Sequence, residues 1–159
     1  MSEVGALAAA HQAVDAGAWA DAVSALDADP AVRDSSEGLE LLALASYGDA
    51  QFERSVSAWE QRYELCSGAG DPGEAARSAA MVAMYLMMDT GLMAPVRGWL
   101  ARAERLIADD LDAPAHAIVA MTRTSELFLC GDMAAATTQS SLAISLGERL
   151  GVQPAVVIC

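Results

Sequence analysis

The sequence predicts an all-α protein built from paired helices, and three observations support this fold class. Ala and Leu carry most of the apolar character, because 54% of the 159 residues are hydrophobic but only 5% are aromatic. Such a composition favours closely packed helices over sheets. β-branched residues are sparse, and no stretch shows the alternating pattern of a strand. Finally, four Gly-containing turns separate apolar segments that have the periodicity of a helix.

These turns divide the chain into eight predicted helices. The turns lie at Gly17, Gly48, Gly91 and Gly131, where each Gly follows an apolar segment, as is typical beyond a helix C-terminus. An Asp follows Gly48 and Gly131 directly, at a position where it can cap the next helix. The helices pair into four hairpins, at about residues 3–28, 36–67, 72–109 and 114–150 of one domain, 1–159. The predicted helices span Glu3–Ala16, Ala18–Asp27, Ser36–Tyr47, Ala50–Ser67, Pro72–Thr90, Ala94–Asp109, Pro114–Cys130 and Met133–Leu150.

The residues after the four turns are in register, at intervals of 33, 41 and 40 residues. A large apolar residue is followed three positions later by a small one and four positions further on by a bulky one. The small residue lets two helices approach where they cross, and the bulky one fills the space a turn later. The last pair, Ala136 and Ser140, follows this pattern poorly. Such a repeat predicts an α-solenoid, and the alternative is a generic helical bundle with coincidental turns. The aligned sets are Trp19, Phe52, Met93 and Met133; Ala22, Ser55, Val96 and Ala136; and Leu26, Trp59, Leu100 and Ser140.

Four stretches carry a more specific resemblance. They are residues 37–45 (EGLELLALA), 52–65 (FERSVSAWEQRYEL), 70–77 (GDPGEAAR) and 98–106 (GWLARAERL). The spacing after the turns resembles the tetratricopeptide repeat, and the stretches are similar to the tetratricopeptide region of actinobacterial LuxR-type transcriptional regulators. The resemblance covers most of the chain and implies a tetratricopeptide-like α-solenoid of about four helical hairpins. Because these are packing motifs, they indicate a lineage better than an activity.

The C-terminal end departs from that family pattern. Such regulators usually continue through more repeats to a helix-turn-helix domain that contacts DNA. This sequence stops at Cys159, where residues 155–158 resemble the first turn of a further helix. We therefore expect either a fragment of a longer regulator or a short stand-alone relative. An uncapped last hairpin leaves an apolar face open, so a homodimer through this end is expected.

Charge and targeting signals exclude several function classes. The formal net charge is −13, and all nine basic residues are Arg. Direct nucleic-acid contact is not expected, because it requires a clustered basic patch, and anionic membrane surfaces are disfavoured for the same reason. The N-terminus lacks the basic region of a signal peptide, and no apolar run is long enough to span a bilayer. With three cysteines and no CxxC pair, a cytoplasmic location is expected.

No residue pattern predicts catalysis, a cofactor or a metal site. Residues 68–73 spell GxGxxG, but a helix and not a strand is predicted before them, so we interpret an interhelix loop in which Asp71 caps the next helix and Pro72 takes its first position. His11 and His116 are far apart, with no Cys at zinc-ligand spacing. The cysteines Cys66 and Cys130 are expected to be buried in apolar surroundings. Cys159 is the exception, because it is the last residue and terminal residues are commonly exposed. The chain is therefore not expected to be an enzyme.

A Met-rich stretch between Met81 and Met93 is the most informative chemical feature. Met84 and Met87 are expected in the core. In the tetratricopeptide register, other first-helix positions face an inner surface, which here is apolar and flexible. Such a surface is either covered by another helix or binds an apolar small molecule or a partner helix, and the sequence leaves both open. The predicted groove consists of Leu44, Tyr47, Met81, Tyr85, Met88, Met121, Ser125 and Phe128.

Two functions follow from these observations. The leading hypothesis is a non-catalytic, effector- or partner-binding tetratricopeptide domain of a LuxR-type transcriptional regulator. The alternative is a stand-alone scaffold for protein–protein interaction. A helix-turn-helix encoded in frame after Cys159 would favour the first hypothesis, and a stop codon there would favour the second.

Overall fold

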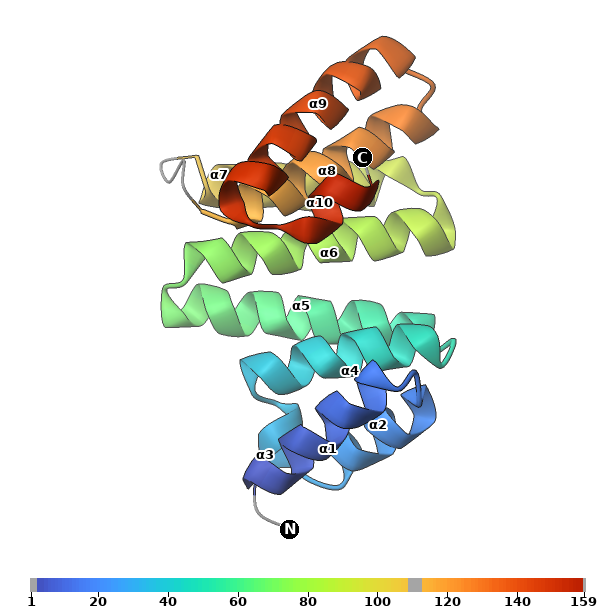
Figure 1. The fold of residues 1–159 in the computed structure, drawn as a ribbon, viewed down its shortest axis with the longest axis vertical. Coiled ribbons are helices and arrows are strands. Elements are labelled where there is room, and N and C mark those ends of the chain that lie inside the picture. The colour runs from blue at the N-terminus through green and yellow to red at the C-terminus, as the bar shows by residue number, and fades with distance from the viewer. Residues whose placement is uncertain (1–2, 109–112, 159) are drawn as a thin grey trace. The chain divides into compact units, whose positions relative to one another are not determined.

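The computed structural model describes the backbone of residues 3–108 and 113–158, with side chains from 5–108 and 113–155. Within these residues the chain forms ten α-helices and no strand, which confirms the all-α prediction (Figure 1). The helices are α1 (Glu3–Asp15), α2 (Trp19–Asp27), α3 (Pro30–Arg33), α4 (Ser36–Gly48), α5 (Phe52–Ala69), α6 (Pro72–Thr90), α7 (Met93–Leu106), α8 (Ala115–Leu129), α9 (Met133–Leu150) and α10 (Gln153–Ile158).

Eight of these helices match the eight predicted ones within a few residues, and two were not predicted as separate elements. The short helix α3 follows Asp29, whose side chain accepts a hydrogen bond from the amide of Val32, and Pro30 starts the helix. The helix α10 begins where the sequence suggested the first turn of a further helix. The expected homodimer stays a prediction, because the side chains of residues 156–158 and all of Cys159 lie outside the described part.

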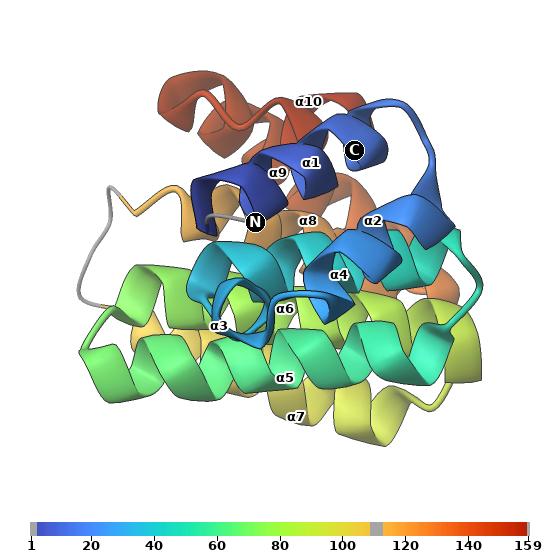
Figure 2. The ribbon, with the colours of Figure 1, turned by 90° about the horizontal axis from the view of Figure 1, so that it is seen from below.

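Two compact units make up the chain, Met1–Leu65 and Cys66–Cys159, with the boundary inside α5. In the first unit, α1 and α2 pack against each other and against α4, around Ala22, Val23 and Ala45. The two views of Figures 1 and 2 show α4 and α5 side by side. Ser55 of α5 donates a hydrogen bond to the carbonyl of Ala43 at 2.7 Å, so the two helices approach closely at this small residue.

The turn after α4 differs from the prediction. The helix continues through Gly48, and Ala50 adopts the left-handed conformation with φ of 59°. Gly48 serves packing instead, because a Cβ at this position would lie 2.3 Å from Cδ2 of the Trp19 ring. The turn therefore lies where the sequence predicts it, but its left-handed residue is Ala50, and Gly48 is required for a close helix contact.

In the second unit, α6 packs against α7 and α8, and α8 packs against α9 and α10. Met84 and Met87 are buried on α6, as expected. Trp99 is only partly buried on α7, where the guanidinium of Arg102 stacks on its ring at 4.6 Å from the centroid.

The loop before α6 is the interhelix connection that the sequence predicted. The preceding element is α5, a helix, so the strand that a dinucleotide-binding turn requires is missing from this described segment. Asp71 accepts a hydrogen bond from the amide of Glu74 at 3.0 Å, and Pro72 is the first helical residue. Both features stabilise the start of α6.

The repeat register agrees with the burial of the side chains. All four small residues of the second set are buried, with Ala136 exposing the most at 5%. In the third set Leu26, Trp59 and Leu100 expose none of their surface, but Ser140 is partly exposed. The fourth hairpin therefore lacks the bulky side chain that fills the equivalent space in the other three.

Candidate ligand-binding site

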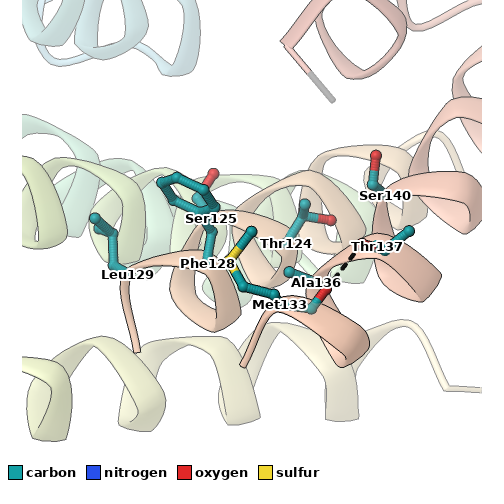
Figure 3. A pocket seen from close by; sticks show the side chains of 8 residues that line it. All are labelled: Thr124, Ser125, Phe128, Leu129, Met133, Ala136, Thr137 and Ser140. Carbon is teal, nitrogen blue, oxygen red and sulfur yellow. Dashed lines mark hydrogen bonds between the residues drawn. The ribbon is translucent and has the colours of Figure 1, made fainter. Parts of the chain in front are cut away.

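A cavity of about 510 Å³ lies between the C-terminal half of α8 and the N-terminal half of α9. The two helices are antiparallel, joined by a short turn, and packed against each other (Figure 1). Figure 3 shows side chains from both helices around the cavity. The lining residues are Thr124, Ser125, Phe128, Leu129, Met133, Ala136, Thr137 and Ser140.

Local sequence explains why two helices meet here. α8 ends at Leu129, and Gly131 adopts φ of 82°, a conformation that reverses the chain and that Gly adopts without strain. Asp132 then accepts a hydrogen bond from the amide of Ala135 at 3.1 Å and caps α9. The short turn places the last residues of α8 beside the first residues of α9.

One end of the cavity is apolar. Phe128, Leu129 and Met133 gather at the end next to the turn, as Figure 3 shows. These side chains expose 56%, 57% and 55% of their surface. Large apolar side chains with this much exposed surface next to a cavity are typical of a binding surface, because the free energy falls when a ligand covers them.

The other end carries hydroxyl groups. Thr124 and Thr137 lie there together with Ser140, away from the turn (Figure 3). The hydroxyls of Thr124, Ser125 and Thr137 donate to the carbonyls four residues earlier, at 2.9, 3.2 and 2.8 Å. A carbonyl only accepts, so each of these three hydroxyl protons is already used. What they offer to a ligand is therefore the lone pairs of their oxygens.

Ser140 leaves space at one end of the cavity. It occupies the register position of Leu26, Trp59 and Leu100, which are fully buried in the other hairpins. The side chain of serine is smaller than that of leucine or tryptophan, so this end of the cavity is wider than a bulky residue would leave it. The poor fit of the last hairpin to the small-then-bulky pattern was the sequence signal for this site.

A buried carboxylate joins α8 to α7. The side chain of Glu126 is 3% exposed, and its Oε1 accepts a hydrogen bond from Nε of Arg97 at 2.7 Å. Nη1 of Arg123 donates to its Oε2 at 3.3 Å, and Arg123 also pairs with Glu104 of α7 at 2.7 Å. The thiol of Cys130 completes the group, 3.5 Å from Oε1 of Glu126. These contacts join two helices through charges that neutralise one another.

The pKa of Glu126 reflects this environment. Burial by itself raises the pKa of the carboxyl group, but the hydrogen bonds from Arg97, Arg123 and Cys130 outweigh it and hold the pKa below its ordinary value of 4.5. The same contact raises the pKa of Arg97. A carboxylate with a lowered pKa stabilises the folded state above its unfolded pKa, and this contribution disappears as the pH falls through the folded pKa.

Replacing Glu126 with Gln is expected to lower the free energy of unfolding at pH 7 by about 1–3 kcal/mol, because charge-assisted hydrogen bonds are lost. The difference from the unaltered chain should shrink as the pH falls below 4.5, where the carboxylate itself becomes protonated. Urea denaturation at a series of pH values measures both effects. The control is Glu148→Gln at an exposed position of α9, expected within about 0.5 kcal/mol of the unaltered chain. If the difference in unfolding free energy between Glu126→Gln and the unaltered chain stayed constant down to acidic pH, the role assigned to the charge of Glu126 would be wrong.

The exposure of Cys130 differs from the prediction. It is exposed, whereas Cys66 is buried as predicted. Nη2 of Arg97 donates to its sulfur at 3.2 Å, so the thiol belongs to the polar group around Glu126. No sequence pattern indicates this contact, because Arg97 and Cys130 are 33 residues apart.

The residues of the predicted groove lie in different environments. Ser125 and Phe128 line the cavity between α8 and α9. Met121, one turn earlier on α8, is buried at 4% exposure, and on α6 Tyr85 is buried while Met88 is 61% exposed. Leu44, Tyr47 and Met81 are partly buried, the first two in the first unit and Met81 in the second.

The cavity also contains residues that sequence analysis did not assign to a site. Met133, Ala136 and Ser140 were noted only as repeat positions. Two of the remaining three flank the predicted positions Ser125 and Phe128 on α8, and the third lies on α9, a second helix for which the first-helix register assigns no groove position. They are Thr124, Leu129 and Thr137.

Comparisons with protein-family models, with curated proteins and with solved structures find no match for this chain. In the part of the chain that the structure describes, no group of three or more His, Cys, Asp or Glu side chains is arranged to hold a metal ion. No helix among the described residues is both long and apolar enough to cross a membrane. The site is therefore interpreted from its own geometry.

Proposed function

We propose that this chain is a non-catalytic, effector-binding domain of a LuxR-type transcriptional regulator, built as a tetratricopeptide-like α-solenoid. The cavity between α8 and α9 is the single observation that carries the binding function. Its volume of about 510 Å³ is within the range of small-molecule sites, about 300–1,000 Å³. An apolar end next to a hydroxyl-lined end also suits a small molecule that has to be oriented.

The dimensions of the cavity favour a small molecule over a partner helix. On α9 the lining residues run from Met133 to Ser140, which corresponds to about 10 Å along a helix axis. An amphipathic helix that binds through three turns needs a groove of about 16 Å. The proposed occupant is therefore an apolar small molecule.

The regulator and solenoid parts of the proposal are supported by the sequence resemblance and by the burial of the repeat positions. The small and bulky residues of the first three hairpins are buried at equivalent positions, as stacked helical hairpins require. The net charge of −13 opposes contact with phosphate, so DNA binding is assigned to another domain of such a regulator.

The alternative, an interaction scaffold, is favoured by one observation outside the cavity. Met88 at the end of α6 and Leu92 before α7 are 61% and 62% exposed. Exposed apolar side chains of this size are common where proteins meet. A scaffold of this kind does not require small molecules in the cavity, so the experiment below separates the two functions.

Replacing Ser140 with Leu is expected to narrow the hydroxyl-lined end of the cavity and to weaken binding of a neutral apolar dye such as Nile red. The protein should remain folded, because Leu or Trp occupies the equivalent position of the other three hairpins. Fluorescence titration of the dye measures binding, and circular dichroism with thermal unfolding measures the fold. A melting temperature equal to or above that of the unaltered chain is expected, since the leucine side chain fills part of the cavity.

The matched control is Ser141→Leu, the same substitution one residue along α9 at an exposed position that does not line the cavity. This variant should bind the dye like the unaltered chain. Equal dye binding by both variants would exclude the cavity as the site, and absence of binding by the unaltered chain would favour the scaffold.

A further inference from the structure

The chemistry of the cavity also indicates the class of its ligand, an inference that rests on the proposed function. We infer that the cavity between α8 and α9 binds an apolar primary amine in its ammonium form. The apolar body would lie against Phe128, Leu129 and Met133, and the ammonium group would lie at the end with Thr124 and Thr137.

The hydroxyl groups select a hydrogen-bond donor. The hydroxyl protons of Thr124, Ser125 and Thr137 are held by backbone carbonyls of their own helices. A ligand that needs a donor, such as a carboxylate, would have to break one of these bonds. An ammonium group has three N–H donors and no acceptor. It can therefore donate to the hydroxyl oxygens while the hydroxyl protons stay bonded to the backbone carbonyls.

The net charge of the chain favours a cation. None of the eight lining residues is charged, so no basic side chain of the lining would pair with an anion. The guanidinium groups of Arg97 and Arg123 are already paired with Glu126, and Arg123 also with Glu104. The formal net charge of the chain is −13, and a net negative charge favours a bound cation over an anion.

The apolar end suits the hydrocarbon body of the ligand. The ring of Phe128 lies at this end of the cavity and offers it an apolar surface. Met133 contributes a flexible and polarisable thioether that adapts to ligand shape. These side chains suit an aliphatic or aromatic body of limited length, since the lined part of α9 spans about 10 Å.

A series of matched probes tests the inference. Octylamine, octyltrimethylammonium, 1-octanol and octanoate share one apolar chain but differ in charge and in hydrogen-bond donors. Their dissociation constants for the full chain can be measured by competition with Nile red at low and at moderate salt. We expect octylamine to bind about tenfold or more tightly than octanoate and more tightly than 1-octanol, with the advantage decreasing as salt is added. Octyltrimethylammonium, which has the charge but no donor, should bind about tenfold more weakly than octylamine.

The double variant Thr124→Val/Thr137→Val removes two acceptor oxygens and keeps the side-chain shape. It should lose most of the preference for octylamine over 1-octanol while binding 1-octanol like the unaltered chain. The probe series on the unaltered chain gives a result even if this variant does not fold.

The outcomes distinguish the two proposals. Octanoate binding as tightly as octylamine, or equal affinity for all four probes, would overturn the amine assignment. The proposed function would stand in that case if Ser140→Leu still weakened binding of 1-octanol. No binding of any probe, including Nile red, would overturn both.

Discussion

Replacing Trp59 with Ala is expected to lower the free energy of unfolding by about 3–5 kcal/mol, the usual range when a large core side chain is truncated. Trp59 exposes none of its surface, and it is the largest fully buried side chain of the described residues. The guanidinium of Arg62 lies 5.8 Å from the centroid of its ring, so truncation also removes a cation–π contact. Equilibrium unfolding in urea, followed by circular dichroism, measures the loss.

Trp99→Ala is the matched control for Trp59→Ala. Trp99 is only partly buried and also stacks with an arginine, Arg102. Its truncation should therefore cost clearly less than that of Trp59. Equal losses would show that the burial of Trp59 does not dominate its contribution, and the repeat register would lose its main energetic support.

Replacing Gly38 with Ala is expected to destabilise the first unit by about 3 kcal/mol or more, because overpacking against a backbone is not relieved by a change of rotamer. A Cβ at Gly38 would lie 1.9 Å from the carbonyl oxygen of Val32 and 2.8 Å from that of Arg33. Both carbonyls belong to α3, which packs on the first turn of α4. The substitution therefore has to displace α3 or unwind the start of α4.

Gly98→Ala controls for the intrinsic helix propensity of the same substitution. Gly98 lies inside α7, and a Cβ there would meet no atom within 4 Å. The change should stabilise the chain by about 0.5–1 kcal/mol, since Ala favours a helix more than Gly does. Thermal unfolding should thus shift in opposite directions for the two variants. A similar shift for both would show that α3 does not rest on Gly38.

Local chemistry explains why the helices could be predicted from sequence. Capping residues such as Asp71 and Asp132 and turn residues such as Gly131 act on atoms within a few positions of themselves. Their effects are therefore readable in a single sequence. The missed helix α3 is consistent with this, because four residues are too few to show a helical period.

The repeat register could also be predicted, because each hairpin repeats the same packing problem. Small residues at the crossing and bulky residues one turn later are buried in the first three hairpins, including the pair Ser55 and Trp59. The exception at Ser140 was visible in the sequence as a poor match. That this exception leaves a cavity, however, depends on whether another side chain fills the space, which a repeat pattern does not state.

The sequence by itself thus determined the fold class, the approximate ends of eight helices and the positions that form the core. Only the tertiary structure decided that α9 forms the other wall of the cavity, and that Glu126 is buried and not solvated. Arg97 reaches Glu126 across 29 residues, and Thr137 lies across the cavity from Thr124 on another helix. The reason is physical: caps and helical periods arise from atoms close along the chain, whereas a cavity and a buried ion pair arise from the meeting of distant side chains, set by how the helices pack.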